Sequence, residues 1–214
     1  MNKSRPASME ERAYHHGDLR RSLIKAAVAI LTENQDWTFS LREVARRAGV
    51  SHNAPYNHFE DKRDLLAEVA AAGFETLRER MLAAIPGIED AETALTSAAV
   101  VYVRFGIENP AHYRLMFGSV LATKQKDRPK PLMVAGENAR AVLEEIIHRG
   151  AEQGVFTASP KKKEELHLAV LSAWSVVHGL TMLAIDGMAE TPRLTMDGIA
   201  KKLSQTLCYG LIRR

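Results

Sequence analysis

Apolar residues recur at helical spacing along nearly the whole chain, and no stretch keeps up the two-residue alternation of a surface strand. The pattern therefore predicts an all-α fold. Helices are expected after Gly17-Asp18 as far as about residue 33, from Leu41 to the turn at Gly49, in a short segment after Ser51, from 62 to 84, and at about 91–108, 110–118, 131–150, 160–186 and 195–213.

A complete helix start signal stands at Ser40. Ser40 and Glu43 fit a capping box, in which each side chain accepts a hydrogen bond from the other residue's backbone N–H. Phe39 and Val44 occupy the two positions of a hydrophobic staple. Gly49 suits the left-handed position that ends a helix. The sequence thus predicts one short helix that ends in a tight turn.

The segment after this turn, SHNAPYNHF, combines hydrogen-bonding side chains with a proline where a third short helix is expected. Ser51 is placed to cap that helix, and Pro55 falls within its first turn, where N–H groups mostly lack intrahelical partners. Two short helices joined by a glycine turn form a helix-turn-helix, whose second helix enters the major groove of DNA. Asn53 and Asn57, four residues apart, are expected on one face, and an amide there favours adenine.

Other side chains of the motif are expected to contact the phosphate backbone or to hold the motif together. His58 and Lys62 are placed for phosphate, and Tyr56 is also expected to tie the unit to the preceding helix. The full set of residues predicted to contact DNA is Ser40, Arg42, Ser51, His52, Asn53, Tyr56, Asn57, His58 and Lys62.

The histidines and the serine also invite a metal site or a nucleophilic enzyme. His52 and His58 lie six residues apart, roughly 240° around a helix, so they do not share a face. The chain has no His-x-x-x-His pair, its single cysteine is Cys208, and it has neither a Gly-x-Ser-x-Gly elbow nor a phosphate-binding glycine loop. The sequence predicts no metal, no cofactor and no catalytic residue.

The stretch FSLREVARRAGVSHNAPYNHFEDKRDLL resembles the N-terminal DNA-binding domain of TetR/AcrR-type transcriptional regulators. The shared pattern is the capped helix, the Ala-Gly-Val-Ser turn, an aromatic pair at Tyr56 and Phe59, and Lys62. The resemblance implies a dimer that binds a palindromic, double-stranded operator and acts as a repressor, released by a small ligand in an all-helical C-terminal domain.

The chain departs from the usual TetR-like pattern at three consecutive positions. Asn53 stands where glycine is frequent, Ala54 where a hydroxyl often touches phosphate, and Pro55 where an aliphatic residue is usual. The alternative function is therefore a helical interaction protein whose DNA-binding head has degenerated. Operator affinity that falls steeply with salt distinguishes the regulator from this alternative.

The helical pattern divides the chain into two domains. A DNA-binding domain is expected over 14–64, with its motif at about 40–59, followed by a connecting helix at 65–84. The segment IPGIED, Ile85 to Asp90, marks the boundary with a ligand-binding and dimerisation domain at 88–214. Trp174, with His178 and Gly179, resembles a C-terminal subgroup of the family named for Trp, His and Gly.

Aromatic and methionine side chains gather in the C-terminal half, where they suit a pocket for a largely apolar effector. The same composition suits a plain hydrophobic core, and the pattern leaves both interpretations open. The residues predicted to line the pocket are Tyr102, Phe105, Tyr113, Met116, Phe117, Trp174, His178 and Met182.

The last two predicted helices are candidates for a homodimer contact. The helix at 160–186 is apolar nearly all round, and the helix at 195–213 carries a stripe formed by Met196, Ile199, Leu203 and Leu207. Pairing both helices with their symmetry mates closes a four-helix seam about a two-fold axis. The alternative is that the stripe packs only on its own chain.

Charge and composition add little to this picture. The formal net charge is +3 and the pI is about 9.0, a weak preference for polyanions. The run from Leu168 to Ile185 approaches the length of a membrane span, but its polar residues favour a buried helix of a soluble bundle. With no secretory signal expected at the N-terminus and no disulfide, the predicted location is the cytoplasm, without a membrane partner.

Overall fold

The computed structural model describes residues 9–85, 87, 89–121, 127–189 and 193–211, and within these ranges the side chains from Asp18 to Gly210. Its regular elements are helical, which confirms the all-α prediction. They are α1 (Met9–Asn34), α2 (Leu41–Arg47), η1 (Ala54–Asn57), α3 (Lys62–Ala84), α4 (Ala91–Glu108), α5 (Pro110–Phe117), α6 (Lys130–Glu152), α7 (Lys163–Ile185) and α8 (Met196–Leu211).

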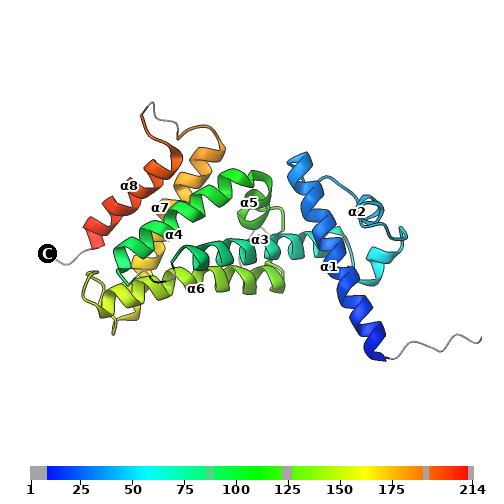
Figure 1. The fold of residues 1–214 in the computed structure, drawn as a ribbon, viewed down its shortest axis with the longest axis horizontal. Coiled ribbons are helices and arrows are strands. Elements are labelled where there is room, and N and C mark those ends of the chain that lie inside the picture. Colours follow the sequence, from blue (N-terminus) through cyan, green and yellow to red (C-terminus); the bar gives the residue numbers. More distant parts are fainter. Residues whose placement is uncertain (1–8, 86, 88, 122–126, 190–192, 212–214) are drawn as a thin grey trace, which may run out of the picture.

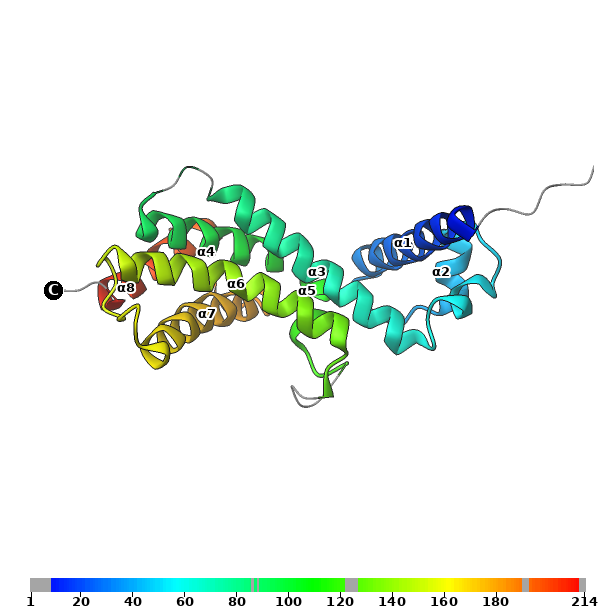
Figure 2. The same cartoon turned by 90° about the horizontal axis from the view of Figure 1, so that it is seen from below.

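The helices form two lobes joined by one long helix. The head consists of α1, α2, η1 and the first turns of α3, and the body consists of the rest of α3 with α4 to α8 (Figure 1). Turned by 90°, the molecule shows α3 running out of the head and along the body beside α6 (Figure 2). Buried apolar side chains of both lobes form one cluster, so the head is anchored on the body through a shared core.

The local start and stop signals of the head lie where the sequence places them. The hydroxyl of Ser40 accepts a hydrogen bond from the N–H of Glu43 at 3.2 Å. The carboxylate of Asp61 caps α3 by accepting from the N–H of Asp64 at 2.8 Å. Gly49 has a φ of 70°, the left-handed conformation expected after α2. Both staple residues are buried in the core.

Three helix boundaries differ from the sequence prediction. α1 begins at Met9, well before residue 17, because the preceding residues are good helix formers and one interior glycine costs only about 1 kcal/mol. α7 begins at Lys163, because a turn in which the N–H of Lys162 bonds to the carbonyl of Ser159 at 3.1 Å precedes it. The helix expected to be capped by Ser51 is a single 3-10 turn that begins at Ala54.

The short helix α5 packs tightly against α3, close to the junction of the two lobes. Gly73 of α3 leaves no room for a side chain, since a Cβ there would lie 2.6 Å from Sδ of Met116 and 2.7 Å from Nε2 of His112. That Nε2 lies 2.6 Å from the carbonyl oxygen of Val69. Burial lowers the pKa of His112, so the ring is neutral and donates its Nε2 proton to this carbonyl.

α7 lies on the outside of the body and is less covered than the sequence suggests. Among the described helices it is the one long and apolar enough to cross a membrane, yet it packs against α4, α6 and α8. Its prediction as a buried helix is wrong, since 28% of its most apolar window is buried. Leu168 is 60% exposed and Leu171 is 42% exposed. α7 therefore presents an apolar surface that its own chain does not cover.

The predicted stripe on α8 faces mostly inward. Ile199 is buried and Met196 packs beside it, while Leu207 contacts the main core. Leu203 is 40% exposed. The alternative in which the stripe packs on its own chain thus describes three of the four residues, because α4 lies against α8 and covers that face.

Candidate DNA-binding surface and ligand cavity

The turn η1 presents polar side chains at the outer end of the head. Its Ala54 and Pro55 are buried, so the proline anchors the turn in the core of the head. Tyr56 is 53% exposed, and its predicted packing against the preceding helix is wrong. Asn57 is exposed beside it. The two apolar residues of η1 therefore face the core, and its tyrosine and amide face solvent.

Asn53 and Asn57 are both exposed, but the segment that links them is a 3-10 turn and not the α-helix from which the sequence prediction placed them on one face. A 3-10 helix has three residues per turn, so positions four apart are separated by about 120° around the axis. Asn53 is the residue before η1, and its carbonyl accepts a hydrogen bond from the N–H of Tyr56 at 3.2 Å. η1 therefore does not hold the two amides on one face in the way that an α-helix would, although both are exposed.

Most of the other predicted DNA contacts are accessible in the structure. The exposed members of the set are Ser40, Arg42, Ser51, His52, Asn53, Tyr56 and Asn57. His58 is half-buried, with its Nε2 atom shielded from solvent. Lys62 is also half-buried, with Nζ 5.3 Å from the ring centroid of Phe39. Burial lowers the pKa of Lys62, and the nearby carboxylate of Asp36 partly offsets this effect.

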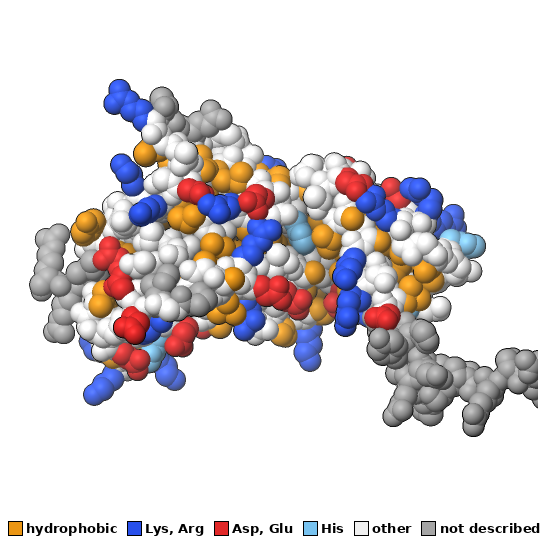
Figure 3. All heavy atoms as spheres, in the orientation of Figure 1, with side chains coloured by type: hydrophobic (Ala, Val, Ile, Leu, Met, Phe, Trp, Pro, Cys, Tyr) orange, Lys and Arg blue, Asp and Glu red, His pale blue; other side chains and the backbone are white. Residues whose placement is uncertain are grey.

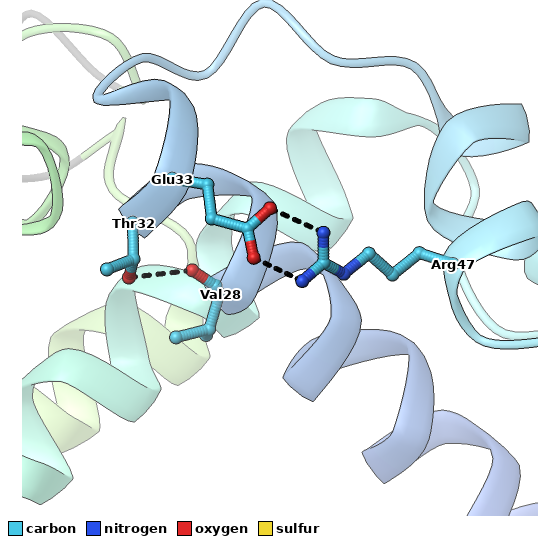
Figure 4. Close-up of polar contacts among 4 residues, drawn as sticks. All are labelled: Val28, Thr32, Glu33 and Arg47. Atoms are coloured by element: carbon cyan, nitrogen blue, oxygen red, sulfur yellow. Dashed lines mark hydrogen bonds and ion pairs between the residues drawn. The ribbon is translucent and has the colours of Figure 1, made fainter.

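Basic side chains of α2 differ in how they are held. Arg42 and Arg46 are exposed, whereas the guanidinium of Arg47 forms paired hydrogen bonds with the carboxylate of Glu33 on α1 (Figure 4). This exposed ion pair links α1 and α2 at the surface, above the apolar core that they share. Lys and Arg side chains gather at the outer end of the head, beyond the junction with the body (Figure 3). That end of the head can attract phosphate, while Arg47 has a structural partner already.

The body contains a cavity of about 430 Å³. Its walls come from α3, α4, α6, α7 and α8, together with Phe117 at the end of α5. Most wall residues are apolar, among them Phe74 and Leu77 of α3 and Leu132 of α6. A cavity of this size and lining is typical of small-molecule sites.

Three of the eight predicted pocket residues line this cavity, namely Tyr102, Phe117 and Trp174. The other five, Phe105, Tyr113, Met116, His178 and Met182, lie outside its wall. Tyr113 and Met116 are fully buried core residues. Sequence reasoning missed the contributions of α3 and α6, whose apolar stripes have the same helical spacing in a cavity wall as in a core.

A hydrogen-bonded chain of side chains stands behind the aromatic end of the cavity. His178 Nδ1 lies 2.6 Å from the hydroxyl of Tyr113, which donates to the hydroxyl of Tyr102 at 2.9 Å. Trp174 Nε1–H donates to the same Tyr102 oxygen at 3.1 Å. The Tyr102 hydroxyl also lies 3.3 Å from Nδ1 of His178, so both tyrosine hydroxyls meet the same ring nitrogen and the hydroxyl protons are shared within this chain.

Burial keeps every member of this chain uncharged. It raises the pKa of Tyr102 and of Tyr113, and it lowers the pKa of His178. A neutral tyrosine hydroxyl both donates and accepts hydrogen bonds, so Tyr102 places one polar group in the aromatic wall of the cavity. No cluster of three or more His, Cys, Asp or Glu suited to a metal occurs among the described residues.

Charged side chains border the cavity on α6 and on the segment before it. Arg140 is paired with Glu144 one turn further along α6. Arg128 is half-buried, and its guanidinium donates to the carbonyl oxygen of Met116 at 2.9 Å. Burial lowers the pKa of Arg128, although the side chain stays charged at any physiological pH.

Comparison with known families and structures agrees with this two-lobed arrangement. Residues 23–69 match the profile described as "Bacterial regulatory proteins, tetR family", and residues 95–206, more than half of the chain, match "Tetracyclin repressor-like, C-terminal domain". The Trp-His-Gly subgroup stays a prediction.

Solved structures share the fold over nearly the whole chain. A protein of unknown function from Rhodococcus sp. RHA1 is 29% identical, with a TM-score of 0.77 over 94% of this chain and 98% of its own. A TetR family transcription regulator from Marinobacter aquaeolei VT8 is 17% identical, with a TM-score of 0.66 over 96% and 100%. The FadR regulator of Bacillus subtilis, solved in complex with stearoyl-CoA, is 17% identical, with a TM-score of 0.69 over 89% and 98%.

Proposed function

Because the chain belongs to the TetR family of bacterial regulatory proteins, a family of DNA-binding transcription regulators, we propose that it is a dimeric repressor. It binds a palindromic operator in the cytoplasm through the two heads. A largely apolar small molecule in the cavity of the body releases it. The observation that carries this proposal is the pairing of a polar, solvent-facing η1 with a cavity in a separate lobe, joined through α3.

The outward face of η1 supports operator recognition. Asn53, Tyr56 and Asn57 are exposed together with His52, so amide, hydroxyl and imidazole groups are free to meet base edges or phosphate. Ala54 and Pro55, which depart from the usual family pattern, are buried. Their substitution therefore leaves the outward face of η1 polar, and this favours the regulator over a degenerate head.

The uncovered face of α7 supports a two-fold dimer. Leu168 and Leu171 are exposed on α7, and on α8 Leu203 is 40% exposed and Tyr209 is 70% exposed. Apolar surface of this kind is stabilised by burial against a second copy. A two-fold axis at this face would carry two heads, and recognition requires them to be one DNA turn apart, about 34–36 Å.

Contacts between α5, the loop after it and α3 offer a route from the cavity to the head. Phe117 lines the cavity at the end of α5, and α5 holds α3 through the hydrogen bond of His112 to Val69. Near the start of α3, Arg63 donates to the carbonyl of Leu121 at 2.6 Å. A ligand that prefers a different position of α5 would shift the population toward a different spacing of the heads.

The proposal is tested by fluorescence anisotropy of labelled duplexes at several salt concentrations. The probe duplex is the DNA immediately upstream of the gene, and a scrambled duplex of equal composition is the control. We expect a clear preference for the native duplex and affinity that falls steeply with salt. Weak binding to both duplexes, together with no enrichment in a random-sequence selection, would contradict operator binding.

The dimer is tested by a charge placed on the uncovered face. We expect Leu168→Glu to convert a dimer into monomers in light scattering and to weaken operator binding, because a buried unpaired carboxylate is costly. Leu82→Glu is the matched control, since Leu82 is 38% exposed on α3. Equal dimerisation of both variants would place the interface elsewhere.

A further inference from the structure

Arg128 stands out among the charged groups of the cavity wall. It is half-buried and lines an otherwise mostly apolar space. Arg140, the other arginine of the wall, already has Glu144 as its ion-pair partner. Arg128 forms no ion pair with any residue in the described part of the chain.

The hydrogen bond to the Met116 carbonyl does not neutralise the charge of Arg128. The guanidinium carries five N–H donors in a planar fork, and one nitrogen is occupied by the Met116 carbonyl at 2.9 Å. That carbonyl belongs to the last turn of α5, where helix carbonyls lack intrahelical partners and favour a nearby cation. The contact explains why Arg128 is held at the wall, but it leaves a partly desolvated positive charge without an anion.

The rest of the cavity defines the body of the molecule that would supply this anion. Phe74, Leu77 and Leu132 line the cavity with apolar surface, and Trp174 adds an indole face. The volume of about 430 Å³ lies within the range of small-molecule pockets. The wall also includes Glu137 and His167. An occupant that complements the apolar surface and Arg128 is mainly apolar and carries one negative charge near that guanidinium.

We propose that the cavity binds an amphipathic carboxylate, whose apolar chain fills the space between α3, α6 and α7 and whose head group pairs with Arg128. A carboxylate matches the planar fork of a guanidinium with two parallel hydrogen bonds. This inference rests on the proposed role of the cavity as the effector site, and it names the chemical class of the effector.

The position of Arg128 gives the carboxylate a direct effect on α5. We infer that a carboxylate on the remaining N–H donors would draw the guanidinium toward the ligand and change its hydrogen bond to the Met116 carbonyl. Met116 lies against Gly73 of α3, so loosening the end of α5 is transmitted to the helix that bears the head. The proposed pairing would thus give the charge of the ligand, and not only its volume, an effect on α5.

The test uses Trp174 as a built-in reporter of the full-length protein. Replacing Trp37, the other tryptophan, by phenylalanine leaves Trp174 in the cavity wall as the source of indole fluorescence. Dodecanoate, dodecanol and dodecyltrimethylammonium share one chain length and differ in head-group charge, and each is titrated below its micelle concentration. We expect dodecanoate to bind at least about tenfold more tightly than dodecanol, and the cation to bind most weakly.

Variants of Arg128 separate a ligand contact from a structural one. Arg128→Gln is expected to weaken dodecanoate about 10- to 100-fold and to leave dodecanol unchanged, while Arg128→Lys retains part of the preference. Lys130→Gln is the matched control, because it removes one positive charge from an exposed residue two positions after Arg128 that does not line the cavity. Thermal melting of each variant verifies folding, and Arg128→Lys supplies the comparison if the glutamine variant does not fold.

The outcomes separate this inference from the proposed function. Equal affinity for dodecanoate and dodecanol, or a preference for dodecanoate that survives Arg128→Gln, would overturn it. Tighter binding of dodecanoyl-coenzyme A than of dodecanoate would overturn the assignment of a free carboxylate. Arg128-dependent binding of dodecanoate in a protein that binds no DNA would support the carboxylate site and refute the repressor. Operator binding with no response of Trp174 fluorescence to any probe would support the repressor and refute the carboxylate site.

Discussion

Replacing Gly73 by alanine adds one methyl group at the contact between α3 and α5. Its Cβ would lie 2.6 Å from Sδ of Met116 and 2.7 Å from Nε2 of His112, so one of these side chains must move. The thioether end is flexible, but His112 is held by its hydrogen bond to the Val69 carbonyl at 2.6 Å. The strain therefore falls on a buried hydrogen bond between the two helices.

The size of the effect follows from three terms. Alanine gains about 1 kcal/mol over glycine in a helix interior. Overpacking costs about 1–3 kcal/mol, and a weakened buried hydrogen bond costs about 1–2 kcal/mol. We expect Gly73→Ala to lower the free energy of unfolding by about 1–4 kcal/mol, which is a fall in Tm of roughly 2–15 °C for a chain of this length.

Gly136→Ala on α6 is the matched control. Its Cβ would lie 3.6–3.9 Å from the ring of Phe74, an ordinary contact, so the helix gain of up to about 1 kcal/mol should remain. Thermal and urea unfolding of both variants without ligand give the comparison. If Gly73→Ala is as stable as Gly136→Ala, α5 has freedom to move away from α3, and the close contact does not link the two lobes.

Three further predictions concern the head, the hydrogen-bonded chain and pH. Asn57→Ala is expected to cost about 1–3 kcal/mol and to relax base preference, whereas Lys62→Ala should weaken all sequences alike and lower the salt slope by about one unit in anisotropy titrations; identical behaviour of the two variants would refute this division of roles. Tyr113→Phe removes the hydroxyl that faces Nδ1 of His178 at 2.6 Å, and it should cost about 1–3 kcal/mol in urea unfolding; no loss would mean that the chain does not stabilise the body. Burial lowers the pKa of His112 and of His178 in the folded state, so the unfolded state binds more protons below about pH 6.5 and stability should fall there by up to about 1.4 kcal/mol per pH unit for each ring. His112→Gln should reduce this dependence in urea midpoints measured at pH 7.5 and 5.5, and an unchanged slope would contradict the assignment.

Local signals predicted the head well because capping is decided by neighbours in sequence. Ser40, Gly49 and Asp61 each act within four residues, and each stands in the structure where the pattern places it. The sequence predicted a short helix after Ser51, and this prediction was wrong in its conformation and length. Buried Pro55 and the turn before it shorten the helix to one 3-10 turn. A 3-10 helix has fewer residues per turn than an α-helix, so residues four apart, such as Asn53 and Asn57, are not aligned as the sequence prediction assumed.

The cavity was harder to predict because its wall depends on how five helices pack against one another. Tyr102 and Trp174 line it, yet Phe105, one turn after Tyr102, packs under the guanidinium of Arg80 at 5.5 Å. Both aromatic residues fit the same pattern of apolar positions. A stripe that faces a cavity and a stripe that faces a core differ only in what the opposite helix leaves unfilled, and sequence periodicity does not contain that information.

The excess of apolar residues on α7 has a physical meaning that joins the cavity to the proposed dimer. Leu171 lines the cavity, whereas Leu168 on the same helix is 60% exposed and lies outside the cavity wall. Leu207 of α8 lines the cavity as well. A single layer of helices therefore separates the effector space from the face proposed to pair with a second copy. Under the proposed function, a ligand that expands this space would act on α5 and α3 from one side and on α7 and α8 from the other, and head spacing would respond to both movements. The proposed effector site and the proposed dimer would together account for a helix that is apolar nearly all round, with its inner side toward the ligand and its outer side toward a partner.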